Sequence, residues 1–157
     1  FTRMAPRHMR MPRVEIEIEN TGEHALGVDD AGRPYRLPGG EPGAILYRGP
    51  SSVCGVGTSE EWGFSFRAFP FAGLVPGRMC LRNYAAGAAE GLLSMHKLWR
   101  GHHPVRNMST WMVTGAKVRL SREVPFQIGG DRLGYRQEID YAVASSRVDL
   151  LDWSTLQ

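Results

Sequence analysis

The sequence has 157 residues, of which 42% are hydrophobic and 22% charged, and its formal net charge is +3. These values indicate one globular domain, since domains commonly run to ~100–200 residues. The basic excess is small, and the 17 arginines are scattered rather than clustered, which excludes an arginine-rich nucleic-acid-binding tract. No secretory signal pattern is visible and no apolar run approaches the ~20 residues that span a membrane, so we expect a cytoplasmic protein.

The chain opens with an irregular segment. Residues 1–12 are rich in Arg, Met and Pro without a steady period, which predicts a mobile lead-in before a domain over residues 13–157. The first residue is Phe rather than Met, and this suggests a fragment of a longer protein.

Regular structure is predicted from residue 14 onwards and is mostly extended. Val14, Ile16 and Ile18 alternate with glutamates, the period of a strand with one face in water. Further extended segments are predicted at 24–28, 35–37, 44–47, 53–56, 62–71, 78–84, 113–121, 125–128, 135–144 and 148–153. Gly49-Pro50 is expected to end one of these strands, and Pro70 is expected to end another or lie at its edge.

One helix is predicted in the middle of the chain. Residues 85–98 contain Ala, Glu, Leu, Met and Lys with apolar side chains at helical spacing, and Gly101 ends the segment. Residues 106–111 suggest a short further turn of helix. About nine strands with one mid-chain helix indicate a mainly β fold, a β-sandwich or a barrel, and we favour the sandwich.

The residues that usually carry chemistry are sparse. Cys54 and Cys80 lie between apolar neighbours and are expected to be buried free thiols. The five histidines show no zinc-like spacing to cysteine or carboxylate, and neither a nucleophile elbow nor a Walker loop is present. We therefore expect no complete catalytic site within this chain.

Gly129-Gly130-Asp131, which follows the predicted strand at 125–128, is the most informative segment. Two glycines allow a ligand to approach the backbone, and the carboxylate of Asp131 could hold a magnesium ion or accept a proton. The alternative is a tight β-turn with a solvated aspartate.

Three stretches, taken in order, resemble the C-terminal domain of the diacylglycerol kinase and sphingosine kinase family of lipid kinases. The first runs from Ala44-Ile-Leu-Tyr-Arg-Gly-Pro50 into Gly63-Phe-Ser-Phe-Arg-Ala-Phe-Pro-Phe71. The second is Lys97-Leu-Trp-Arg-Gly101. The third comprises Val118-Arg-Leu120, Val124-Pro-Phe-Gln-Ile-Gly-Gly-Asp131 and Val148-Asp-Leu-Leu-Asp152.

The resemblance implies one half of a two-domain, ATP-dependent enzyme. In this family an N-terminal α/β domain carries a Gly-Gly-Asp-Gly-Thr nucleotide loop, the C-terminal domain is a β-sandwich, and the active site lies between the two. ATP and Mg²⁺ are then cofactors of the parent enzyme, and this chain alone is expected to bind neither. The implied partners are a lipid substrate and the missing nucleotide-binding domain, with peripheral membrane contact, no nucleic acid, and a homodimer as a further option.

The resemblance also assigns expected roles to individual residues. Asp131 is the expected catalytic and magnesium-facing residue, and Gly129 and Gly130 are expected to approach nucleotide or substrate. Arg67 and Arg78, together with Arg82, flank the aromatic stretch and could meet phosphate, although ordinary surface arginines are the alternative. Phe69 and Phe71 could line an acyl-chain groove, whereas Phe64 and Phe66 are expected to pack in the core.

The third stretch departs from the family pattern at a functional position. The pattern there is usually Asp-Gly-Glu, whose Asp is the proposed general base; this Asp falls on Gly129, and the Glu falls on Asp131. The parent could therefore phosphorylate poorly, act on another lipid or have lost catalysis.

Two hypotheses from other classes stay open. The first is a non-catalytic β-sandwich that binds a lipid or a protein. The second is an oligosaccharide- or nucleic-acid-binding barrel, motivated by Trp62, Trp99 and Trp111, which are expected to be exposed beside arginines.

Overall fold

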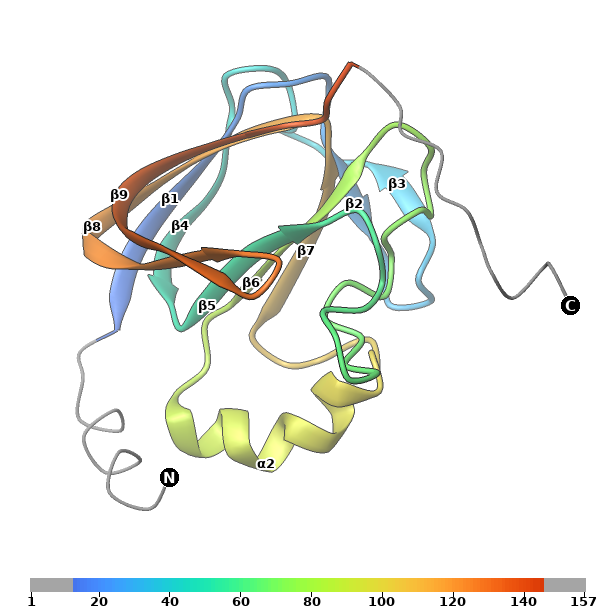
Figure 1. The fold of residues 1–157 in the computed structure, drawn as a ribbon. Helices are drawn as coiled ribbons and strands as arrows, with labels where there is room; N and C mark the ends of the chain where they lie inside the picture. Colours follow the sequence, from blue (N-terminus) through green and yellow to red (C-terminus); the bar gives the residue numbers. More distant parts are fainter. Residues whose placement is uncertain (1–12, 146–157) are drawn as a thin grey trace, which may run out of the picture.

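Two antiparallel sheets form the fold, which was obtained as a computed structural model and is described for residues 13–145 (Figure 1). Within these residues there are nine strands and one helix, α2. The strands are β1 (Val14–Asn20), β2 (Leu26–Val28), β3 (Pro34–Arg36), β4 (Ile45–Ser51), β5 (Val53–Gly57), β6 (Met79–Tyr84), β7 (Met108–Val113), β8 (Gly115–Ile128) and β9 (Asp131–Ala142). The mainly β fold with a single mid-chain helix is confirmed, and it is consistent with a β-sandwich.

The four-stranded sheet has the order β4-β1-β8-β9, and the five-stranded sheet has the order β3-β2-β7-β6-β5. The main core lies between them, because alternate residues of β1 turn inward. Ile16 and Ile18 are buried there, while Glu17 and Glu19 lie on the outer face. The five-stranded sheet contributes Leu81, Trp111 and Val113, among others, to the same core.

The outer face of the four-stranded sheet carries a network of ion pairs. Arg119 pairs with Glu17 at 3.0 Å, with Glu19 at 2.8 Å and with Glu138 at 3.3 Å. Arg48 also pairs with Glu17. Arg119 and Arg48, two of the scattered arginines, are therefore engaged with carboxylates of neighbouring strands.

The outer face of the five-stranded sheet is covered by irregular chain and by the helix. Phe71 packs on Cys80 and Met112 in one cluster, and Tyr84, Ala86 and Val105 form a second. Figure 1 shows α2 across the bottom of the view, outside both sheets.

Helix α2 spans Ala88–Trp99, close to the predicted 85–98. Gly87 at its N-cap provides no side-chain hydrogen bond, and Glu90 lies in the first turn. The helix ends because Gly101 takes a left-handed conformation (φ 67°), which its lack of a side chain permits. No helix in the described part of the chain is long and apolar enough to cross a membrane.

Strands β8 and β9 form a long hairpin that bends away from the sheet at its outer end (Figure 1). β1 pairs with β8 only as far as Leu120. Beyond it the β8–β9 register shifts between Arg119 and Val124 and again between Pro125 and Gln127, as bulges do where a strand bends. The outer hairpin is thus supported mainly by its own pairing.

Three predictions about local structure were wrong. Residues 62–71 form no strand, because Phe64 and Ser65 take left-handed backbone angles (φ 51° and 58°) that interrupt extended chain. The turn of helix expected at 106–111 is instead largely strand β7, which is paired on both sides. Gly49-Pro50 does not end a strand; Pro50 is tolerated in β4 because β4 lies at a sheet edge and needs fewer backbone donors.

Three side-chain predictions were also wrong. Phe64, expected in the core, is 96% exposed. Phe66, also expected in the core, is half-buried between the rings of Trp62 and Trp99. Trp111, expected at the surface, is buried against Tyr47. The strand expected at 148–153 lies outside the described residues.

Candidate functional site

The Gly129-Gly130-Asp131 segment forms the tip of the β8–β9 hairpin. Ile128 pairs with Asp131, so the two glycines are the whole loop, and both have positive φ (58° and 94°). This is the requirement of a type I′ turn, which Asn-Gly, Asp-Gly and Gly-Gly satisfy best. All three residues are exposed, and a Cβ added to either glycine would meet nothing within 4 Å. The tip therefore has the geometry of the alternative that the sequence left open, a tight β-turn with an exposed aspartate.

Arg67 and Arg78, which the sequence grouped as phosphate contacts, have different environments. Arg78 is mostly buried: its guanidinium donates to the carbonyl oxygens of His24 (2.8 Å) and Met112 (3.3 Å) and to the carboxylate of Glu23 (3.0 Å). These hydrogen bonds join β7 to the chain before β2, so Arg78 has a structural role. Arg67 lies at the surface with its Nη2 3.7 Å from Glu60 and is open to a ligand.

Phe69 and Phe71 pack against the protein. Phe71 is 9% exposed in the cluster with Cys80 and Met112, and the ring of Phe69 covers Gly55 and Gly57 of β5. Neither ring offers the open apolar surface that an acyl-chain groove requires. The predicted groove is therefore not present at these two residues in this arrangement of the chain.

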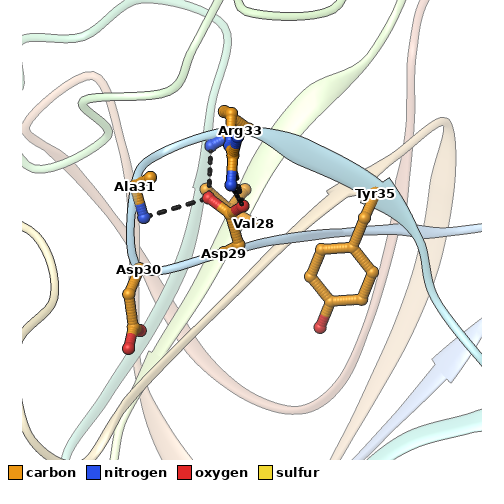
Figure 2. A pocket seen from close by; sticks show the side chains of 6 residues that line it. All are labelled: Val28, Asp29, Asp30, Ala31, Arg33 and Tyr35. Atoms are coloured by element: carbon orange, nitrogen blue, oxygen red, sulfur yellow. Dashed lines mark hydrogen bonds and ion pairs between the residues drawn. The ribbon is translucent and has the colours of Figure 1, made fainter.

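A shallow depression lies at the turn between β2 and β3 (Figure 2). It is lined by Val28, Asp29, Asp30, Ala31, Arg33 and Tyr35. A second depression shares Asp30 and Ala31 and extends to Glu60, Arg67, Phe71 and His103. Together they form an open surface with charges of both signs.

Asp29 organises this turn. Its carboxylate accepts hydrogen bonds from the backbone of Ala31 (3.0 Å) and Arg33 (2.8 Å) and from Nε of Arg33 (3.0 Å), as Figure 2 shows. The backbone hydrogen bond from Arg33, followed by the side-chain bond and charge of Arg33, lowers the pKa of Asp29 from its ordinary value of 3.8. Asp29 is thus an ionised turn-forming residue rather than a proton donor at neutral pH.

His103 joins the second depression to the same turn. Its Nε2 lies 2.8 Å from the carbonyl oxygen of Asp29, so Nε2 carries the proton and donates. Nδ1 is buried and has no hydrogen-bond partner among residues 13–145. The imidazole also packs edge-to-face against the ring of Phe71, with 4.8 Å between the ring centroids, and this contact holds it in place.

Arg82, the third arginine expected to meet phosphate or to lie at the surface, is instead buried in β6, as are its neighbours Asn83 and Tyr84. Arg82 donates to the carbonyl of Ala68 (2.7 Å) and to the hydroxyl of Thr110 (3.3 Å), both uncharged groups. Burial lowers the pKa of Arg82, because desolvation disfavours its charge. Arg82 holds the 67–69 segment against β6, and only its place in a buried strand could have indicated this role.

The two thiols are poorly suited to nucleophilic chemistry. Both cysteines are free, and burial raises the pKa of Cys54 to about 12 and that of Cys80 to about 11. The thiolate is the reactive form, so little of it exists at neutral pH.

The described residues offer few metal ligands together. Among residues 13–145 no group of three or more His, Cys, Asp or Glu side chains converges on one point. Mg²⁺ in nucleotide sites commonly takes one or two protein carboxylates and completes its shell with water and phosphate. Asp131 fits the role of one such ligand, provided that nucleotide and the remaining ligands come from elsewhere.

Comparison with known proteins gives no assignment: no protein-family model matches the chain, and no curated protein matches it.

Proposed function

We propose that this chain is the substrate-side domain of an ATP-dependent lipid kinase of the diacylglycerol kinase type. The observation that carries the proposal is the exposed hairpin tip with Asp131, at the place where the family resemblance expects a functional carboxylate. The resemblance spans three ordered stretches, and the two-sheet fold is the kind that it implies.

The geometry of the tip supports the proposal because it accounts for the departure from the family pattern. Asp-Gly and Gly-Gly are both favoured in type I′ turns, so the family's Asp-Gly-Glu and Gly129-Gly130-Asp131 suit the same two-residue loop. Replacing the first residue of that loop removes a carboxylate without altering the turn. Asp131 then remains as the carboxylate at the start of β9.

Phosphoryl transfer depends mainly on positioning and on neutralising charge. In the proposed reaction a lipid hydroxyl oxygen bonds to the γ-phosphorus of ATP, ADP leaves, and the hydroxyl proton passes to a base. Asp131 would accept that proton or contact the magnesium-bound phosphates, while Arg67 could meet phosphate from the surface. Magnesium, when bound, supplies charge neutralisation at the phosphates.

The test is the substitution Asp131→Asn in the natural gene product that contains this chain. The readout is transfer of labelled phosphate from ATP to diacylglycerol in detergent micelles. We expect a loss of about 100-fold or more, the scale of removing a general base. An undiminished rate would remove Asp131 from the site.

Asp140→Asn is the matched control. Asp140 is an exposed carboxylate on the same strand, 3.5 Å from Lys117, and an exposed pair of this kind contributes about 1 kcal/mol or less to stability. This variant should retain activity within about twofold.

A non-catalytic lipid- or protein-binding module is the second candidate. Two observations favour it: glycine stands where the family has its base, and a large apolar surface is exposed on α2 and the neighbouring loop. Saturable lipid binding by the gene product, without any phosphate transfer, would support this candidate over the kinase.

A further inference from the structure

Six large apolar side chains at one end of the molecule are exposed, and we call them the docking face. Four belong to α2 and two to the loop before Phe66. They are Leu92 (74% exposed), Leu93 (79%), Met95 (45%), Trp99 (43%), Trp62 (44%) and Phe64 (96%).

The helix directs its larger apolar side chains away from the protein. Leu92, Met95 and Trp99 are spaced by three and four residues and so form one continuous ridge. The side that packs inward is smaller: Leu98 contacts the Tyr84 cluster, and Gly91 lies beside the Tyr84 ring. This is the reverse of the usual amphipathic arrangement, in which the apolar stripe faces the core.

Ring stacking joins the loop to the helix. The ring of Trp99 lies 5.2 Å from that of Phe66, which in turn lies 6.0 Å from that of Trp62. The backbone of Arg67 donates to the carbonyl of Trp99 at 3.0 Å. The two segments therefore form one surface, and Figure 1 shows the green 58–75 segment above the C-terminal end of α2.

Phe64 projects from this surface. Phe64 and Ser65 both have left-handed backbone angles (φ 51° and 58°), an uncommon conformation for residues other than glycine. The resulting tight turn, closed by the hydrogen bond from Phe66 N to Gly63 O (2.9 Å), leaves the Phe64 ring almost fully exposed.

The docking face is a large apolar patch for a monomer. Taking about 200 Å² for each of its three aromatic side chains, their exposed fractions alone correspond to roughly 370 Å², and the two leucines and Met95 add to this area. Monomeric proteins seldom leave more than about 300–600 Å² in one apolar patch unless it binds something.

Basic residues border the face. Lys97 lies one helical turn from Leu93, Arg100 follows Trp99, and Arg67 adjoins Trp99 through its backbone. Two nearby carboxylates already have partners: Glu60 is close to Arg67, and Glu90 accepts hydrogen bonds from Asn107 (2.8 and 3.0 Å). Glu61 is the remaining acidic residue of the loop.

We propose that the docking face binds the surface of an anionic lipid bilayer, with Phe64 and the Leu92–Trp99 ridge entering the interfacial region. This proposal rests on the proposed function, for which it supplies the route to a substrate that resides in the bilayer. An outward apolar ridge, interfacial tryptophans and flanking cations are the features of interfacial membrane-binding segments. A single projecting ring suits a soft lipid phase better than the flat, self-complementary surface of a dimer.

The experiment is co-sedimentation of the purified natural gene product that contains this chain with vesicles of phosphatidylcholine, with and without about one-third phosphatidylglycerol. We expect binding to the anionic vesicles. This binding should weaken when the salt concentration rises from about 0.1 M to 1 M, because the Debye length falls from about 10 Å to 3 Å. Phe64→Ser and Leu92→Ser should each reduce binding about tenfold or more. Lys97→Gln with Arg100→Gln should reduce binding to the anionic vesicles alone.

Ile45→Ser is the matched control, since Ile45 is 42% exposed on the edge strand of the other sheet. It should bind as the wild type does. Phe64 is almost fully exposed, so its variant is expected to fold, which circular dichroism checks. An absence of vesicle binding, or equal binding by all variants, would overturn the proposal. So would a wild-type dimer that Phe64→Ser dissociates in the ultracentrifuge, because the face would then be a protein interface.

Failure of this proposal and failure of the proposed function can be told apart. Vesicle binding is measured without ATP and does not depend on catalysis. Phosphorylation of a short-chain lipid in detergent micelles does not require docking on a bilayer. Either result can therefore stand without the other.

Discussion

Gly57→Ala tests whether Phe69 is a packing residue. Gly55 and Gly57 lie on the same face of β5, and the Phe69 ring covers both. A methyl group at Gly57 would lie 2.2 Å from Cδ2 of Phe69 and 2.5 Å from Cγ, so the ring must move. A methyl group at Gly55 would lie 3.4 Å from Cζ, an ordinary contact.

The two glycines therefore form a matched pair with opposite expected effects. Overpacking costs typically about 1–3 kcal/mol, so we expect Gly57→Ala to lower the free energy of unfolding by about 1–2 kcal/mol. Gly55→Ala should be neutral or raise it by up to about 1 kcal/mol, since alanine restricts the unfolded chain. For a chain of this length each 1 kcal/mol corresponds to about 2–4 °C in Tm.

The assay is urea unfolding of both variants, each alone and combined with Phe69→Ala. Removing the ring should abolish most of the Gly57→Ala cost, giving a coupling energy of about 1 kcal/mol or more. Equal stability of the two glycine variants would refute the reasoning. A Gly57→Ala cost that persists without the Phe69 ring would refute it as well.

Three further predictions concern other parts of the structure. Folding lowers the pKa of Asp29, so the stability that its ionised carboxylate contributes is present above the ordinary pKa of 3.8 and is lost as the pH falls through the lower folded pKa. Asp29→Asn should therefore make the free energy of unfolding fall less steeply at acid pH. An unchanged acid limb of the stability–pH curve would contradict this. Cys54 and Cys80 should resist iodoacetamide at pH ~8 in the folded chain, because their raised pKa values leave little thiolate, and should react after unfolding. Intact mass measures the modification, and rapid double modification of the folded chain would contradict this expectation. Arg78→Met should destabilise the fold by about 2–3 kcal/mol, because it removes the charged donor that bonds two carbonyl oxygens and the carboxylate of Glu23. Arg67→Met should cost less than about 1 kcal/mol, since it removes only an exposed ion pair. Thermal unfolding separates the two variants, and equal losses would be inconsistent with their environments.

Strand β1 and helix α2 show which features of the fold could be predicted from the local sequence pattern. Val14, Ile16 and Ile18 alternate with glutamates, so the sequence predicts both the strand and its inward face. Pattern could place the helix at Ala88–Trp99, but not its orientation. Leu92 and Leu93 resemble core residues in sequence, and only the packing of Leu98 and Gly91 shows that they face outward.

The aromatic loop and β7 show where pattern fails. Phe64-Ser65-Phe66 alternates as a strand does, yet Phe64 and Ser65 have left-handed angles, and the segment packs through Phe66 on Trp99, which is distant in the sequence. β7 contains Thr110, Trp111 and Val113, residue types that are common in strands, and β2 and β6 pair with it on both sides. The hairpin turn, by contrast, was predictable, since Gly-Gly between extended segments is a strong local signal.

The proposal that this chain is the substrate-side half of a lipid kinase is tested most directly by a transfer assay. The assay follows labelled phosphate from ATP to diacylglycerol in detergent micelles, with the natural gene product that contains the chain. We expect a labelled lipid phosphate whose formation requires Mg²⁺ and falls on Asp131→Asn. A correctly folded gene product that phosphorylates no hydroxyl-bearing lipid would contradict it.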